Sequence, residues 1–171
     1  MKRFICLILA FVFLLAGCHS MQNRSSDIVD FYYLRVFQTE EDHAAYFSDG
    51  AITSEQRDVS GHREDLTYLL TMYLRGPLDS HLVSPFPTGC SLIGVQQDGS
   101  ELTVQLSSGA SLLNDLDLSI ACGCLAQTCM SLADVDTVHI KSLSTINEVL
   151  FSITLTADSL LLEVTQPEEP Q

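Results

Sequence analysis

The sequence predicts an α+β domain over residues 28–165, with the element order β-β-α-β-β-α-β-β. Two helices are expected to pack on one face of a mainly antiparallel sheet. Three observations predict this class: two segments carry apolar residues at helical spacing, several short segments alternate or are rich in β-branched residues, and turn residues separate them. Mixed strands and helices of this length are typical of a single layered domain.

The first predicted elements are two strands and a helix. Residues 28–37 are rich in aromatic and β-branched side chains, and residues 51–59 alternate well enough for a second strand. Gly76 and Pro77 end the helix that precedes them. That helix, residues 63–75, places its large apolar side chains at i, i+3, i+4, i+7 and i+8, one face of a helix, as Leu66, Leu69, Leu70, Tyr73 and Leu74.

A proline-containing loop and a hairpin follow. Residues 83–89 contain two prolines, which fix φ and favour extended neighbours, so this segment is a rigid loop. Residues 90–95 and 101–106 are apolar runs on either side of Asp98-Gly99. An Asp-Gly pair between apolar runs is a strong signal for a β-hairpin.

The last predicted elements are a helix and three strands. Residues 135–142 are expected to form a strand, and residues 149–155 and 160–164 a final hairpin around Ala157-Asp158. The helix before them, residues 112–132, carries one apolar stripe of Leu118, Cys122, Leu125, Cys129 and Leu132.

The N-terminus has the organisation of an export signal. Lys2 and Arg3 precede an apolar run over residues 4–15, which is shorter than the about 20 residues that a membrane-crossing helix needs. The run ends in the letters LAGC at residues 15–18, which resemble the bacterial lipobox. We therefore expect residues 1–17 to be removed and Cys18 to carry the lipid. The alternative is an ordinary signal peptide or a weak anchor with a chance cysteine.

This N-terminus implies a lipid-anchored protein on the extracytoplasmic face of the cell membrane. Several acyl chains on Cys18 would satisfy the two-signal requirement for stable anchoring. Residues 18–27 are polar and are expected to tether the domain, and residues 166–171 contain no large apolar residue and are expected to be disordered.

The charge balance excludes several classes of partner. The mature chain would keep six of the eight Lys and Arg residues and all 22 Asp and Glu residues, a formal charge of −16. Binding to nucleic acid or to an anionic lipid surface requires a basic patch. We therefore expect no nucleic-acid partner, and attachment to the membrane through the lipid on Cys18 alone.

Several short motifs occur in a fixed order within the domain. The first helix ends in LRGP at residues 74–77, the loop reads SPFPTGCSL at residues 84–92, and the next strand contains LTVQLS at residues 102–107. A helix containing Thr128 and a strand with Val135, Val138 and Ile140 complete the series. Together, behind a lipobox, these motifs resemble the GerMN domain of spore-germination and sporulation lipoproteins.

This resemblance covers roughly residues 28–165 and implies a fold related to the ring-building motif of envelope-spanning assemblies. It also implies protein–protein assembly outside the membrane, with envelope proteins or other copies as partners, in sporulation or germination. Two positions depart from the family pattern: Gln105 stands where the strand usually has Asp, and Cys90 stands where the loop usually has Thr or Ser. The family has no catalytic residues to carry over to this chain.

The cysteine spacing does not favour a metal or redox site. Cys122 and Cys124 are two residues apart and would point in opposite directions on a helix, so they could not share an ion. We expect Cys122 and Cys129 to face the core and Cys124 to face away, without a metal ion. Pairing of Cys90 with a helix cysteine remains open for an exported protein.

No catalytic pattern is present. The histidines have no metal-ligand spacing, and the sequence contains no nucleophile-elbow motif. We expect no enzymatic activity and no cofactor. The expected function is protein–protein assembly in the cell envelope, and the alternative is a module that binds peptidoglycan or another wall polymer through the candidate interaction loop of Pro85, Phe86 and Pro87.

Overall fold

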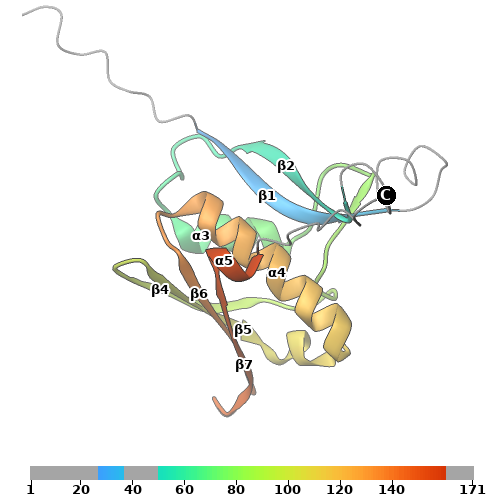
Figure 1. Cartoon of the computed structure of the whole chain (residues 1–171), viewed down its shortest axis with the longest axis vertical. Helices are drawn as coiled ribbons and strands as arrows, with labels where there is room; N and C mark the ends of the chain where they lie inside the picture. The colour runs from blue at the N-terminus through green and yellow to red at the C-terminus, as the bar shows by residue number, and fades with distance from the viewer. Residues whose placement is uncertain (1–26, 37–49, 161–171) are drawn as a thin grey trace, which may run out of the picture.

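The computed structural model describes residues 27–36 and 50–160 (Figure 1). Two helices lie between two β-sheets, and the chain crosses from one sheet to the other through the proline-containing loop. The elements are β1 (Ile28–Arg35), β2 (Ile52–Asp58), α3 (Leu66–Leu74), β3 (Leu82–Val83), β4 (Leu92–Asp98), β5 (Glu101–Ser107), the 3₁₀ helix η1 (Ser108–Leu112), α4 (Asp115–Leu132), β6 (Thr137–Leu143), β7 (Val149–Thr156) and α5 (Ala157–Leu160).

The smaller sheet has the strand order β2-β1-β3, and both pairings are antiparallel. β3 pairs with only two residues of β1, so no strand among the described residues covers most of that edge of β1. Helix α4 lies along this edge: the Tyr32 amide donates to Thr128 Oγ1 at 2.9 Å, and Ser131 Oγ donates to the Asp30 carbonyl at 2.7 Å. Hydroxyl groups of a helix thus satisfy backbone groups of a strand edge, which protects the edge from pairing elsewhere.

The larger sheet has the order β4-β5-β6-β7, with β5 and β6 parallel and the other pairs antiparallel. The parallel pair follows from the connection, because η1 and α4 carry the chain back to the starting end of the sheet. The inner face packs on the helices and buries alternate residues, namely Leu102, Val104, Leu106, Val138 and Ile140. The alternate residues that point outward from β5 and β6 are mostly polar, such as Thr103, Gln105 and His139.

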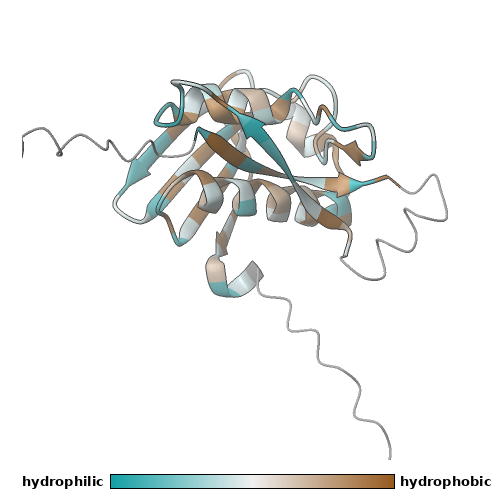
Figure 2. Ribbon diagram, turned by 90° about the horizontal axis from the view of Figure 1, so that it is seen from above, coloured by the Kyte–Doolittle hydropathy of each residue, from teal (hydrophilic) through white to brown (hydrophobic). Residues whose placement is uncertain are grey.

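The core lies between the two sheets. Helix α3 buries Leu69, Leu70 and Tyr73, so the predicted face of this helix and the predicted burial of Leu70 are confirmed. Tyr73 stacks on Tyr33 of β1, with 5.0 Å between the ring centroids. In Figure 2, apolar residues (brown) recur along the helices and the strands on either side of them.

The α+β class, the single domain and the mainly antiparallel pairing are confirmed, but the prediction of one sheet was wrong. The strands form two sheets, and α4 contacts both β1 and the larger sheet instead of lying on one face of one sheet. The physical reason is the edge of β1, whose hydrogen bonds go to α4 and not to a neighbouring strand.

The final predicted hairpin also differs. Residues 157–160, where we expected the turn and the start of the last strand, form the short helix α5. Ser159 supplies the local reason, because it exchanges hydrogen bonds with Thr156 at the helix start. Residues 161–164 of the predicted strand, the tail and residues 1–26 lie outside the described residues. Among the residues that are described, no helix is long and apolar enough to cross a membrane.

Candidate functional site

A buried ion pair joins β2 to the segment that follows α3. The Arg57 Nε donates to Glu55 Oε2 at 2.6 Å, and both side chains are almost fully buried. Glu55 Oε1 accepts from the backbone amides of Leu78 and Asp79 at 2.8 and 2.7 Å. Arg57 Nη2 donates to the Gly76 carbonyl at 2.7 Å. The pair therefore holds the end of α3 and its following turn against the smaller sheet.

Aromatic rings surround the guanidinium group of Arg57. Its central carbon lies 5.2 Å from the ring centroid of Phe31 and 5.8 Å from that of Tyr33, within the range of cation–π attraction. Tyr33 Oη donates to the Tyr73 carbonyl at 3.0 Å, and burial raises the pKa of the Tyr33 phenol. These groups are hydrogen-bonded to one another and enclosed, so the cluster stabilises the fold and offers no reactive group to a ligand.

The LRGP motif belongs to this structural cluster. Gly76 has φ +97°, a conformation that side-chain-bearing residues rarely adopt, and its amide donates to the Tyr73 carbonyl at 3.0 Å to end the helix. Because the Gly76 carbonyl also accepts from Arg57, the motif places the chain where the buried pair can bind it. Sequence reasoning gave no role to Glu55 or Arg57, since nothing in a polar strand segment indicates which charges become buried.

The candidate interaction loop folds back into the protein. Ser84 Oγ accepts from the Phe86 amide at 3.3 Å, and the Cys90 amide donates to the Pro87 carbonyl at 3.1 Å. Pro85 is buried, Phe86 is 5% exposed within the hydrophobic core, and Pro87 is half-buried. The Phe86 ring of this candidate loop therefore packs in the core, and an interaction role of the loop stays a prediction.

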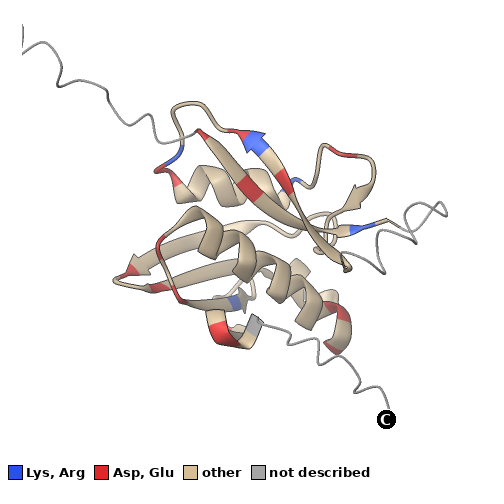
Figure 3. Ribbon diagram, turned by 45° about the horizontal axis from the view of Figure 1, so that its top comes forward, with Lys and Arg blue, Asp and Glu red and all other residues tan. Residues whose placement is uncertain are grey.

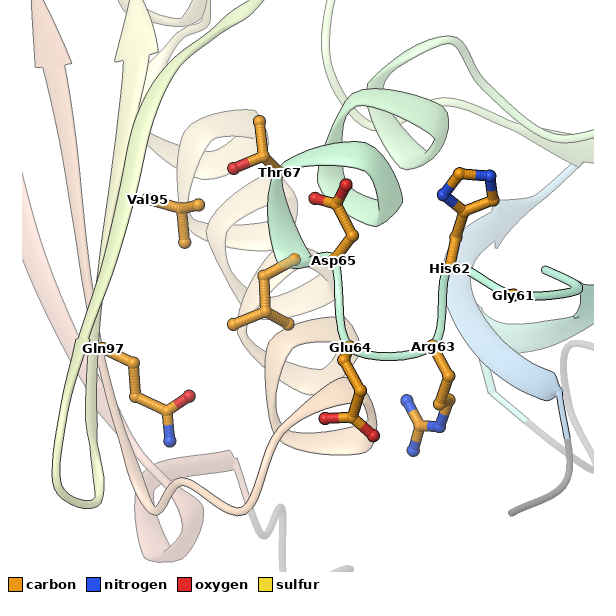
Figure 4. A pocket seen from close by; sticks show the side chains of 9 residues that line it. Gly61, His62, Arg63, Glu64, Asp65, Thr67, Val95 and Gln97 are labelled. Atoms are coloured by element: carbon orange, nitrogen blue, oxygen red, sulfur yellow. The ribbon is translucent and has the colours of Figure 1, made fainter. Parts of the chain in front are cut away.

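A groove of about 680 Å³ opens between β4 and the segment before α3 (Figure 4). In Figure 4, Val95 and Gln97 stand on the β4 side, opposite the chain that leads into α3. A smaller cavity of about 240 Å³ shares part of this lining and extends to the end of α4. The lining of the larger groove is Gly61, His62, Arg63, Glu64, Asp65, Leu66, Thr67, Val95 and Gln97.

The groove wall is held by local hydrogen bonds and stacking. Asp65 Oδ1 accepts from the Tyr68 amide at 2.9 Å and caps α3, and Arg63 Nη1 donates to the Leu132 carbonyl at 3.0 Å. The His62 ring stacks on Tyr68 with 3.9 Å between centroids. Sequence reasoning missed this groove, because only the tertiary structure brings β4 beside the start of α3.

The four described cysteines are all buried, and none forms a disulfide in this structure. Cys122 and Cys129 face the core as predicted, but the prediction that Cys124 faces away was wrong, because it is also fully buried. The reason is that α4 is covered on several sides, by β1 and by the larger sheet. Burial raises the pKa of Cys90 to about 11 and those of Cys122 and Cys124 to about 12.

No three His, Cys, Asp or Glu side chains within residues 27–36 and 50–160 lie close enough together to hold a metal ion. His139 lies on the outer face of the larger sheet, with Nδ1 2.9 Å from Thr154 Oγ1 and Nε2 3.3 Å from Glu101 Oε2. Figure 3 shows acidic residues at several ends of strands and helices, with few basic residues among them. Cys18 and His43 lie outside the described residues.

The model of one protein family, Germane, described by sporulation and spore germination, matches residues 44–154, well over half of the chain. Among solved structures, the tandem GerMN domains of the sporulation protein GerM from Bacillus subtilis are similar at 15% identity and a TM-score of 0.47, over 71% of this chain and 42% of that one. A Clostridium perfringens protein named as a candidate lipoprotein is similar at 14% identity and a TM-score of 0.42, over 67% and 73% of the two chains. No curated protein matches. The match over residues 44–154 establishes that this chain belongs to the Germane, or GerMN, domain family of sporulation and spore germination.

Proposed function

We propose that this protein is a lipid-anchored, non-enzymatic module that assembles with other proteins on the extracytoplasmic side of the membrane, in sporulation or germination. The observation that carries the proposal is the use of the family motifs. The LRGP turn binds Arg57, the SPFPTG loop buries Phe86, and β5 fills the core. These motifs stabilise the interior of the domain, so contacts with other proteins would be made by the remaining surface.

The sequence supports the anchor and the compartment. The lipobox at residues 15–18 would place Cys18 at the membrane, and the expected tether of ten residues spans at most about 33–36 Å when fully extended. The domain would then work close to the membrane surface. A family membership in sporulation and germination agrees with a role in envelope assembly.

The assembly role can be tested by crosslinking in the producing cells. The full-length chain, carrying a photo-activated residue on the outer sheet face at Thr154, is expected to form discrete protein adducts in sporulating or germinating cells. The same residue placed at buried Leu125 is the matched control and should form none, since that position is fully buried. Absence of protein adducts from several exposed positions would contradict an assembly role.

A second function is favoured by one specific observation, the groove in front of β4. The Gln97 amide and the carboxylates of Glu64 and Asp65 can form hydrogen bonds with a wall polymer. The stacked His62 ring offers the polymer a flat surface. Binding of the monomeric mature chain to purified cell wall, lost on Gln97→Ala and Glu64→Ala together, would support this alternative. Unchanged binding in that double variant would exclude the groove.

A further inference from the structure

The structure concentrates exposed apolar side chains at one end of the larger sheet. β5 and β6 are parallel, so Ser107 and Leu143 lie side by side where both strands end, and η1 continues from β5 to pack against β6 and β7. Val149 pairs with Leu143 across the next hairpin. The exposed residues of this apolar end are Leu112, Leu116, Ile146, Val149 and Leu150.

These side chains are exposed on a fixed backbone. Ile146 is 77% exposed in a turn where polar residues are usual. The Ser144 amide donates to the Glu148 carbonyl at 2.8 Å, and the Asn147 amide donates to the Ser144 carbonyl at 3.0 Å. Asn147 has φ +61°, as the tight turn requires. The turn therefore presents Ile146 in one position before any partner arrives.

The start of α4 is fixed in the same way. Leu112 is 81% exposed and Leu116 is 69% exposed, and they flank the capping residue of the helix. The Asn114 side chain accepts from the Asp117 amide at 3.0 Å and donates to the Asp117 carboxylate at 2.7 Å. Ordering these side chains on binding therefore costs little backbone entropy.

The segments at this end carry only negative charges, which favours a basic partner. The segments that form the apolar end, residues 107–120 and 144–150, contain Asp115, Asp117 and Glu148 and no Lys, Arg or His. Lys141, the nearest basic residue along β6, lies on the outer sheet face. A second copy docked through this end would bring acidic rims together, which opposes association.

The apolar end also lies far from the point where the tether joins the domain. The Val59 amide donates to the Asp27 carbonyl, and Asp30 and Arg63 both contact the C-terminal turns of α4. Leu112 and Leu116 lie at the other end of this helix, which is roughly 27 Å long for its 18 residues. The apolar end therefore lies at the opposite end of α4 from the point where the N-terminal segment joins the domain.

We propose that the apolar end docks an amphipathic segment of another protein whose apolar residues are flanked by Lys or Arg. Apolar contacts to Leu112, Leu116 and Ile146 supply the affinity, and the acidic rim selects basic flanks and speeds their approach. This inference names the partner chemistry for the proposed assembly role and rests on that role, but not on the lipid anchor.

The test uses the mature chain, residues 18–171 with Cys18→Ser, which contains the whole described fold. The probe is a labelled 18-residue helical peptide with a leucine face flanked by lysines. In 150 mM salt, the double variant Leu112→Ser, Ile146→Ser should raise the dissociation constant at least 10-fold. The control Leu78→Ser, a residue equally exposed at 82% outside the apolar end, should change it less than twofold.

Two matched peptides separate the apolar and charged contributions. A peptide with glutamates in place of the lysines, and one with serines in place of the leucines, should each bind at least 10-fold more weakly. The variant Asp115→Asn, Glu148→Gln should weaken binding and reduce its salt dependence. Equal binding of the three peptides, or an unchanged dissociation constant in the leucine–isoleucine variant, would overturn the proposal.

If something other than a basic amphipathic segment binds the apolar end, the experiments give different results, and each of these results would overturn the proposal. Dimerisation of the protein alone, lost in Leu112→Ser, Ile146→Ser, would identify a second copy. Binding to phosphatidylcholine vesicles, lost in the same variant, would identify a lipid surface. Crosslinked adducts in cells that persist in this variant would reject the apolar end while the assembly role stands. Peptide binding as expected, without any adduct in cells, would instead reject the assembly role.

Discussion

Arg57 is buried as a charged residue because four groups compensate its charge: the Glu55 carboxylate, the Gly76 carbonyl and the faces of the Phe31 and Tyr33 rings. A buried charge that loses its partner is costly, since it can no longer be solvated by water. Glu55 also accepts two backbone amides from the turn after α3. One side chain therefore stabilises both the charge and the path of the chain.

We predict that Glu55→Gln lowers the free energy of unfolding by about 3–5 kcal/mol, because it leaves Arg57 without its counter-charge. Urea unfolding of the mature chain measures the loss. The control is Glu148→Gln, in an exposed turn where only the backbone of Glu148 is hydrogen-bonded, with an expected change below about 0.5 kcal/mol. A loss in Glu55→Gln no larger than in this control would show that the pair is not structurally important.

At the scale of single elements, a substitution in α3 can test how this helix packs in the core. Leu70 is fully buried, and Leu70→Ala should cost about 2–5 kcal/mol because it leaves a cavity between the helix and the sheet. Leu78→Ala serves as the matched control, since Leu78 is 82% exposed in the turn that follows. Equal midpoints of urea unfolding for the two variants would contradict the packing of α3 described here.

Helix α4 carries buried thiol groups whose pKa values are raised. Burial raises the pKa of Cys122, which Cys90 also raises through its charge, and that of Cys124, each to about 12 from an ordinary value near 9. The folded protein therefore keeps these thiols protonated at pH values where the unfolded chain loses the protons. Their contribution to stability is complete below pH 9 and is lost as the pH rises from about 9 towards 12.

We expect the thiols of the mature chain with Cys18→Ser to react slowly with a disulfide reagent at pH 8, and four to react rapidly in urea. The free energy of unfolding should fall between pH 9 and pH 11, and replacing Cys124 by Ala should make that fall shallower. Rapid reaction of Cys124 in the native protein would contradict its burial. Only two reactive thiols in urea would reveal a disulfide.

At the scale of the whole molecule, the anchor is the first property to test. Cys18→Ala is expected to abolish incorporation of labelled fatty acid, because no other group at that position can carry a thioether-linked lipid. The precursor should then stay unprocessed or be shed from the cells. Cys6→Ala, within the apolar run of the signal, is the control and should retain the label. Equal labelling of the wild type and of Cys18→Ala would reject the lipobox.

The acidic surface predicts the association state of the mature chain with Cys18→Ser. A formal charge of −16 opposes close approach of two copies, strongly at 10 mM salt, where the Debye length is about 30 Å, and less at 150 mM, where it is about 8 Å. Sedimentation across this range should find a monomer alone. A stable closed oligomer at 10 mM salt would contradict the need for a less acidic partner.

The sequence by itself determined the family, the α+β class, the approximate positions of most strands and the buried face of α3. These features depend on local periodicity and turn chemistry, such as the spacing that ends at Gly76 and the Asp98-Gly99 hairpin. The motif order was also readable, because each motif fixes a turn or an apolar strand over a few residues.

Only the tertiary structure decided how the elements share the core. The division into two sheets depends on Thr128 and Ser131 occupying the edge of β1, and the burial of Cys124 depends on α4 being covered by both β1 and the larger sheet. The charge pair of β2, the groove before β4 and the apolar end likewise join residues far apart in the chain. Local sequence patterns predict which residues can be buried. The residues that pack against them are determined by contacts between segments far apart in the chain.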